Sequence, residues 1–171
     1  MTVNRSEIAT AQRSVVVLGL GNPLRGDDGI GPRIVEDLIR RGLPEGVEAL
    51  GGGNMGLDLL HILEGWERAV IVDAADVGLE PGQFTRFTPD SVYLVQQANS
   101  LSFHQAGLSE TLALAEALDL ALPEMVIFGV QPATLGWREG LSPAVEATLP
   151  ALADAVIEEI AGGCLKEENT S

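Results

Sequence analysis

Cysteine is almost absent from the sequence, with Cys164 alone among 171 residues. One cysteine excludes an intrachain disulfide and any metal site built from several thiolates. Because chains without disulfides are typical of reducing compartments, we expect an intracellular, cytoplasmic protein. Cys164 follows two glycines and precedes charged residues, so we interpret it as a surface thiol and not as a nucleophile.

Basic side chains are also scarce. The chain has 10 Lys and Arg against 25 Asp and Glu, which gives a formal net charge of −15. Nucleic acids and anionic membranes are bound through clustered Lys and Arg, and this sequence has only one Lys. We therefore expect neither a nucleic acid nor a membrane surface as a partner.

Long apolar runs are missing as well. No segment approaches the ~18 consecutive apolar residues of a membrane span, and the run Val15–Leu20 is too short for the core of a signal peptide. With 46% hydrophobic residues, a chain of this length fits one packed domain. We predict a flexible arm at 1–13, a single α/β domain at 14–162 and a flexible tail at 163–171. No heptad pattern asks for a second copy, so a monomer is expected.

Apolar runs and helical stripes alternate along the chain. Buried strands are predicted at 15–18, 47–50, 69–72 and 125–130, and helices at 30–42, 57–63, 108–118 and 142–160. The last helix begins at Ser142 as N-cap, with Pro143 in its first turn, and Pro150 is expected to kink it. Phe84–Phe87 is predicted to be an antiparallel or edge strand. This alternation predicts a three-layer α/β/α fold with a mostly parallel central sheet.

Three side chains with metal-binding groups follow predicted strands or precede a predicted helix. Asp28 begins the first helix, Asp73 ends the strand at 70–72, and His104 lies in an irregular segment before the third helix. Ligands of open parallel sheets bind outside the carboxyl ends of the strands. Two carboxylates and one imidazole would bind a divalent cation such as nickel or zinc and leave coordination positions open.

Each of these residues also has a structural interpretation. Asp28 would favour the positive end of a helix dipole, Asp73 would be solvated or paired at a strand tip, and His104 would hydrogen-bond within a loop. A second histidine, His61, is interpreted as a helix-surface residue. We expect Asp27 and Asp76 to be solvent-facing neighbours that are not needed as ligands.

The common signatures of cofactor and hydrolase sites are absent. Gly19-Leu20-Gly21 follows a strand, as in dinucleotide-binding proteins, but Leu24 occupies the place of the third glycine. No phosphate-binding loop, H-E-x-x-H zinc helix or G-x-S-x-G nucleophile elbow occurs. We expect no organic cofactor.

Four segments together resemble the hydrogenase maturation endopeptidases. They are Gly19-Leu20-Gly21-Asn22-Pro23-Leu24-Arg25-Gly26-Asp27-Asp28-Gly29-Ile30-Gly31, Val72-Asp73-Ala74-Ala75-Asp76-Val77-Gly78-Leu79-Glu80-Pro81-Gly82, His104-Gln105 and Gly129-Val130-Gln131-Pro132. In this order and spacing they are very specific, and the resemblance covers about residues 14–160. The metal-contacting positions of that family fall on Asp28, Asp73 and His104, the trio that the strand-end argument selects.

The resemblance implies a cytoplasmic protease that acts on the large subunit of nickel–iron hydrogenases. It implies that the enzyme recognises nickel already inserted in the precursor and then removes a short C-terminal extension. Nickel is then supplied by the substrate. Asp28, Asp73 and His104 would hold it and serve as the catalytic residues, with one carboxylate or a metal-bound water activating the attack. Alternatively, the metal contacts serve recognition alone and a free carboxylate acts as the base.

Two other functions are compatible with parts of the sequence. A non-catalytic nickel-dependent chaperone or scaffold for the precursor would keep the same three residues. Peptidyl-tRNA hydrolases share the opening Gly-Leu-Gly-Asn-Pro, but they continue with a His-Asn pair where this chain has Asp27-Asp28. A net charge of −15 also disfavours binding to tRNA.

Overall fold

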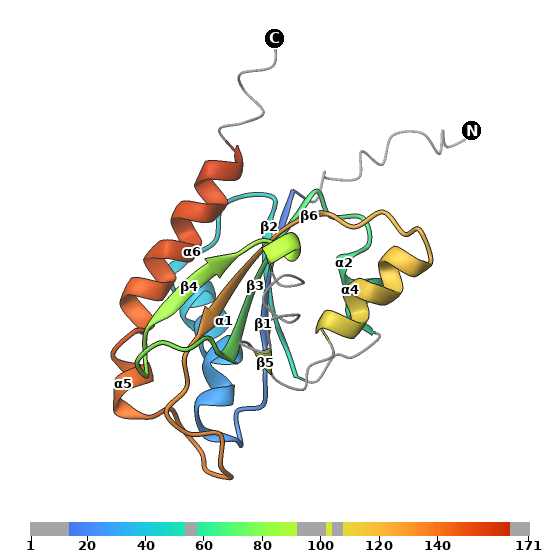
Figure 1. The fold of residues 1–171 in the computed structure, drawn as a ribbon. Helices are drawn as coiled ribbons and strands as arrows, with labels where there is room; N and C mark the ends of the chain where they lie inside the picture. Colours follow the sequence, from blue (N-terminus) through green and yellow to red (C-terminus); the bar gives the residue numbers. More distant parts are fainter. Residues whose placement is uncertain (1–13, 54–57, 92–101, 104–107, 165–171) are drawn as a thin grey trace, which may run out of the picture.

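The chain forms one central sheet with helices on both faces (Figure 1). The computed structural model describes residues 14–53, 58–91, 102–103 and 108–164. In chain order the elements are β1 (Val15–Leu20), the 3₁₀ helix η1 (Gly26–Gly29), α1 (Ile30–Arg41), β2 (Val47–Gly52), α2 (Asp58–Leu63), β3 (Arg68–Asp76), β4 (Phe84–Phe87), β5 (Ser102–Phe103), α4 (Leu108–Ala117), β6 (Glu124–Val130), α5 (Pro143–Glu146) and α6 (Leu149–Cys164).

The sheet has the strand order β2-β1-β3-β6-β4. The β1–β2, β1–β3 and β3–β6 pairs are parallel, whereas β4 runs antiparallel to β6 at the edge. The short strand β5 pairs antiparallel with the end of β3. The mostly parallel sheet, the three layers and the antiparallel edge strand are confirmed.

The strands are buried on both faces because each face is covered by its own pair of helices. One core packs side chains of α1 and α6, including Ile34 and Leu152, against β1, β3 and β6. The other packs α2 and α4, including Leu63 and Leu112, against the opposite face. Every residue of β1 is buried, as its continuous apolar run predicts.

The strand order reverses between β1 and β3, which places the topological switch point between their carboxyl ends, at the lower edge of the sheet in Figure 1. The chain leaves β1 through α1 on one face and reaches the neighbour β2. After β3 it forms β4 and β5, and then passes through α4 on the other face to β6. Ligand sites of open α/β sheets occur where the strand order reverses in this way. Asp28 follows β1, and Asp73 lies in β3.

The C-terminal helix differs from its prediction. Ser142 is the N-cap and accepts a hydrogen bond from Val145 N, as predicted, but the helix breaks after Glu146 and resumes at Leu149. Pro150 therefore lies in the first turn of α6 and does not kink a continuous helix. Proline lacks the N–H of a helix interior and its ring clashes with the preceding turn, so a first-turn position is the one it tolerates.

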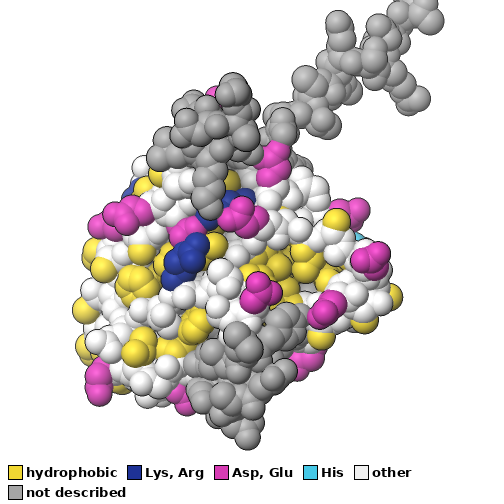
Figure 2. All heavy atoms as spheres, turned by 45° about the horizontal axis from the view of Figure 1, so that its top comes forward, with side chains coloured by type: hydrophobic (Ala, Val, Ile, Leu, Met, Phe, Trp, Pro, Cys, Tyr) yellow, Lys and Arg dark blue, Asp and Glu magenta, His cyan; other side chains and the backbone are white. Residues whose placement is uncertain are grey.

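The domain boundaries stay a prediction. The arm at 1–13 and most of the tail lie outside the described residues, and α6 extends to Cys164, past the predicted boundary at 162. The side chain of Cys164 also lies outside the described part. Within the described ranges, no helix combines the length and the apolar character needed to cross a bilayer. Figure 2 shows acidic side chains spread over one face, with the few basic ones gathered in a small group.

An ion-pair cluster ties α6 to the start of β3 and to β4. Glu159 accepts hydrogen bonds from Arg86, at 2.7 Å from Nε and 3.0 Å from Nη2, and from the buried Arg68. The hydrogen bonds from Arg86 hold the pKa of Glu159 below its ordinary value; partial burial opposes them, and the charges of Arg86 and Arg68 lower the pKa further. The cluster therefore stabilises the fold above the unfolded pKa of glutamate, about 4.3, and its contribution is lost as the pH falls through the lower folded pKa.

We expect Glu159→Gln to lower the free energy of unfolding by about 2 kcal/mol at pH 7, because the buried Arg68 loses the nearer of its two carboxylate partners, Glu159 and Glu124. The difference from the unsubstituted protein should shrink as the pH falls below about 4.3, where the glutamate of the unfolded chain is protonated first. Urea denaturation across this pH range measures both effects. Glu158→Gln, on the exposed neighbour, is the matched control. A loss of unfolding free energy no larger than that of Glu158→Gln would contradict the stabilising role of the ion-pair cluster.

Candidate functional site

Glycines let the β1–α1 turn pack against its own backbone. A Cβ at Gly19 would lie 2.0 Å from the carbonyl oxygen of Gly31, and a Cβ at Gly21 would lie 1.8 Å from that of Asp28. Gly21 also has φ +118°, a conformation that side chains disfavour. These close approaches explain why both positions are glycine.

Asp28 is placed by this tight turn. It lies in η1 directly before α1, and only 3% of its surface is exposed. The Asn22 N–H donates a hydrogen bond of 2.9 Å to its Oδ2. The turn thus brings a buried carboxylate to the carboxyl end of β1, and Asn22 orients it.

The sequence suggested that Asp73 ends its strand. In the structure it lies inside β3, three residues before the strand ends at Asp76. The strand continues to Asp76 because β6 pairs with β3 as far as Ala74 and β5 pairs with Ala75 and Asp76. The β1–β3 pairing ends at Val72, so Asp73 is the first residue of β3 beyond its contact with β1. By strand alternation its side chain lies on the face covered by α2 and α4.

The Asp73 carboxyl is fully buried, and among the described residues neither of its oxygens has a hydrogen-bond partner. Burial raises its pKa well above the usual range, and the negative charge of Asp28 raises it further. The neighbouring Ala74 amide lowers the pKa only in part, since its N–H falls short of a full hydrogen bond. The solvated strand-tip interpretation is therefore wrong, and no described residue pairs with Asp73. A buried carboxyl without a described partner, close to a second carboxyl, favours binding of a proton or a cation.

His104 lies outside the described residues, so its role as third ligand stays a prediction. The residue before it, Phe103, pairs with Ala75, two positions after Asp73. Within the described part of the chain, no group of three or more His, Cys, Asp or Glu side chains is arranged to hold a metal. Two of the three predicted ligands, Asp28 and Asp73, interact electrostatically.

Asp27 is a correction to the sequence prediction, which made it a solvent-facing neighbour. It is fully buried, and it joins η1 to two distant segments. Its Oδ2 accepts hydrogen bonds from Ala133 N at 2.8 Å, Thr134 N at 3.0 Å and the Ser142 hydroxyl at 2.9 Å. Its Oδ1 accepts one from Ser142 N at 2.6 Å. The two adjacent aspartates thus differ: Asp27 holds the turn in place, and Asp28 lies next to Asp73.

Two predictions of exposure near the site are confirmed. Asp76 and His61 are exposed. Gln131, which lies in one of the resembling segments but had no assigned role, fixes the turn after β3. Its Oε1 accepts hydrogen bonds from Val77 N at 2.8 Å and Leu79 N at 3.3 Å. Only the fold reveals this role, because the partners lie more than fifty residues away in sequence.

Chemically, the described site consists of two carboxyl groups at the switch point of the sheet. Asp28 is oriented by a backbone N–H, and Asp73 is buried without a described partner. Such a pair binds a divalent cation through oxygen ligands or holds one shared proton as a general acid or base.

Comparisons with known proteins agree with this arrangement. The family model of the hydrogenase maturation proteases matches residues 32–159. A hydrogenase expression/formation protein, HupD, from Bradyrhizobium diazoefficiens is 36% identical over 149 residues, which cover 86% of this chain and 78% of that protein. The hydrogenase 2 maturation protease of Escherichia coli is 36% identical over 141 residues, which cover 81% and 85%.

Solved structures show the same fold. The hydrogenase maturating endopeptidase HybD from Escherichia coli superposes with a TM-score of 0.73 at 33% identity, over 91% of this chain and 94% of that one. The [NiFe] hydrogenase maturation protease HybD from Thermococcus kodakarensis gives a TM-score of 0.70 at 27% identity, over 86% and 99%. The similarity therefore extends through the whole domain.

Proposed function

The chain belongs to the hydrogenase maturation protease family, and we propose that it removes a C-terminal extension from a hydrogenase large-subunit precursor after nickel has been inserted. The protein is an endopeptidase of hydrogenase maturation. The finer proposal covers the position of the cut, the nickel requirement and the identity of the three residues that contact the metal. We further propose that it acts as a cytoplasmic monomer.

One observation carries the proposal: Asp73 is fully buried, unpartnered among the described residues, and next to the carboxylate of Asp28. Ionising both groups in the free protein is unfavourable, and a cation that enters with the substrate removes this penalty. With His104 they form a carboxylate, carboxylate and imidazole set that suits nickel carried by the precursor. The site is thus built to distinguish a nickel-loaded precursor from an empty one.

Hydrolysis needs a water that attacks the scissile carbonyl, a base that takes its proton, and a proton for the amine that leaves. In one form of the proposal, one carboxylate takes the proton of the attacking water while the substrate's nickel positions the peptide. In the other, that water is also bound to the metal. The cut releases the extension with a free amine and leaves a new carboxylate on the large subunit.

Asp28→Asn separates catalysis from recognition. Its amide keeps the size of the side chain and an oxygen that can accept from Asn22 N, but it loses the negative charge. We expect processing of nickel-loaded precursor to fall at least about 100-fold, while the purified variant still binds the precursor. The mass of the precursor measures processing, and co-elution on a size-exclusion column measures binding.

Glu45→Gln, which neutralises an exposed carboxylate before β2, away from the site, is the control. Undiminished cleavage by Asp28→Asn would contradict a catalytic or metal-contacting role for Asp28. If the unsubstituted protein binds nickel-loaded precursor but never cleaves it, the non-catalytic chaperone becomes the better account.

A further inference from the structure

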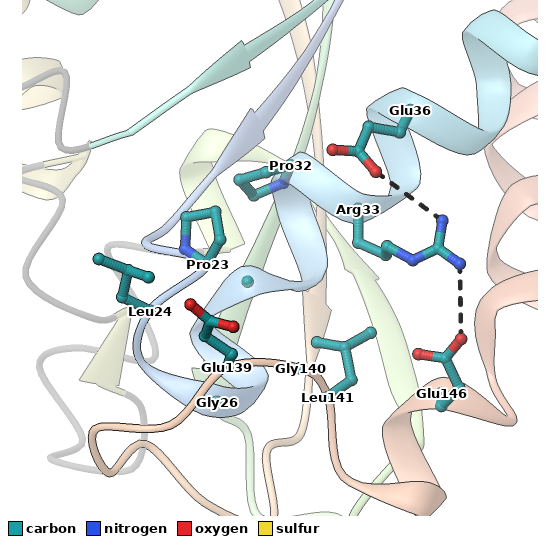
Figure 3. A pocket seen from close by; sticks show the side chains of 11 residues that line it. Pro23, Leu24, Gly26, Pro32, Arg33, Glu36, Glu139, Gly140, Leu141 and Glu146 are labelled. Atoms are coloured by element: carbon teal, nitrogen blue, oxygen red, sulfur yellow. Dashed lines mark ion pairs between the residues drawn. The ribbon is translucent and has the colours of Figure 1, made fainter.

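A pocket lies beside η1, on the surface that the Asp27–Asp28 turn shares with the loop before α5 (Figure 3). Its volume is about 340 Å³, at the lower end of the roughly 300–1,000 Å³ of ligand-binding clefts. Gly26 and Gly29, which flank the two aspartates, form part of its wall. We call it the η1 pocket; the lining side chains that matter for its chemistry are Leu24, Arg33, Glu36, Glu139, Leu141 and Glu146.

The η1 pocket combines apolar walls with excess negative charge. Leu24 and Leu141 offer apolar contact, and three glutamates face one arginine. Arg33 lies between Glu36, at 3.9 Å, and Glu146, at 3.5 Å, as the dashed lines in Figure 3 mark. It balances one of the three negative charges, so two remain in excess. A group that fits this lining has an alkyl stem and a positive end, as Lys and Arg do.

The loop before α5 presents an exposed aromatic side chain on the same surface. Trp137 lies two residues before Glu139 and is 79% exposed, whereas tryptophan is usually well buried. The Arg25 guanidinium lies 5.8 Å from the centre of its ring. Exposed tryptophans held in one conformation are frequent anchors of protein–protein interfaces.

Backbone hydrogen bonds join this loop to the turn that contains Asp27 and Asp28. Gly26 N donates to Arg138 O at 2.8 Å, Arg138 N donates to Leu24 O at 3.1 Å, and Asp27 N donates to Thr134 O at 3.0 Å. The side chain of Asp27 bonds the same loop at Ala133 and Thr134. A partner held by Trp137 and the η1 pocket is therefore positioned relative to Asp28.

From these observations we infer that Trp137 and the η1 pocket form the docking surface for the precursor, and that the pocket receives a Lys or Arg side chain of the precursor beside an apolar segment that covers Trp137. The inference rests on the proposed function, since it names how that substrate is held. The net charge of −15 further favours a basic partner segment.

Two substitutions outside the catalytic site test the surface. Trp137→Ala removes the anchor, and Glu139→Lys reverses a charge at the pocket. Each is expected to raise KM for the nickel-loaded precursor about tenfold and to leave kcat within about twofold, because docking and not chemistry is weakened. The effect of Glu139→Lys should shrink as the salt concentration rises from about 0.05 M to about 0.5 M, because salt screens the interaction between exposed charges. Both side chains are exposed, so the fold should stay intact, which thermal unfolding checks.

Matched controls lie elsewhere on the surface. Leu118→Ala removes an exposed apolar side chain after α4, and Glu45→Lys makes the same charge change before β2. If all four variants have the KM of the unsubstituted protein while that protein cleaves normally, the docking surface is wrong and the proposed function stands. If the unsubstituted protein does not cleave, the proposed function fails. Precursor binding then tests the docking surface. Weaker binding only in Trp137→Ala and Glu139→Lys supports the docking surface, and unchanged binding in both overturns it.

Discussion

Asp73→Asn is expected to stop precursor processing and, at the same time, to make the fold more stable. The rate should fall about 10³-fold, because in the proposed function Asp73 contacts the reacting atoms or their metal and the substitution removes its charge. The free energy of unfolding at neutral pH should rise by about 1 kcal/mol or more, since a neutral amide is easier to bury than a carboxylate without a described partner. For a chain of this size, Tm should rise by about 3 °C.

The gain in stability should depend on pH. The folded-state pKa of Asp73 is raised, so the carboxyl ionises first in the unfolded chain, near pH 3.9, and this ionisation favours unfolding. The cost in the unsubstituted protein is absent below that pH and accumulates as the pH rises towards the folded pKa. The difference in unfolding free energy between Asp73→Asn and the unsubstituted protein should therefore grow from acid to neutral pH.

Asp76→Asn is the matched control, because it changes an exposed carboxylate on the same strand. It should leave both the rate and the stability near those of the unsubstituted protein. Urea denaturation at several pH values and the mass of the processed precursor provide the two measurements. An Asp73→Asn protein that is less stable at neutral pH would show that Asp73 has a stabilising partner. Full activity of the Asp73→Asn protein would show that Asp73 is not part of the active site.

Asp27→Ala is expected to cause the largest loss of stability. The substitution leaves three backbone N–H groups and the Ser142 hydroxyl without their common acceptor in a buried place. Removing the charged partner from such a buried network costs about 3–5 kcal/mol. Asp27→Asn should lose less, because one oxygen still accepts while the amide NH₂ faces N–H donors. Urea denaturation at pH 7 measures each loss.

Asp154→Ala provides the comparison. Asp154 is exposed and pairs with Arg41 on the surface, so its removal should cost less than about 1 kcal/mol. Ser142→Ala should fall between the two, since it removes one hydroxyl from the network and the N-cap of α5. A loss in Asp27→Ala as small as that in Asp154→Ala would show that Asp27 does not hold the turn.

The layers of the fold could be predicted from the sequence because they follow from local patterns. The β-branched run of β1, the helical stripe of α1 and the glycine that ends it each determine a local structure, and parallel pairing follows from their alternation. The break between α5 and α6 could not be predicted from pattern alone. Apolar spacing continues across residues 147–148, and the proline that marks the break is tolerated within a first turn.

The site was predictable only in part, for a similar reason. Strand ends indicate where ligands bind, which placed Asp28 and Asp73 correctly at the carboxyl edge. The role of Asp27 depends on partners 106 to 115 residues away, and an aspartate in a glycine-rich turn has the local appearance of a solvated residue. The burial of Asp73 within β3 likewise depends on pairing with β5 and β6, of which β5 had no sequence pattern.

The most direct test of the account is the mass of a hydrogenase large-subunit precursor after incubation with the protein, with and without nickel loaded into the precursor. The account predicts that only the loaded precursor loses a C-terminal peptide, and that the His104→Ala variant leaves it intact. Cleavage of the nickel-free precursor at the same rate would contradict recognition of the metal by Asp28, Asp73 and His104.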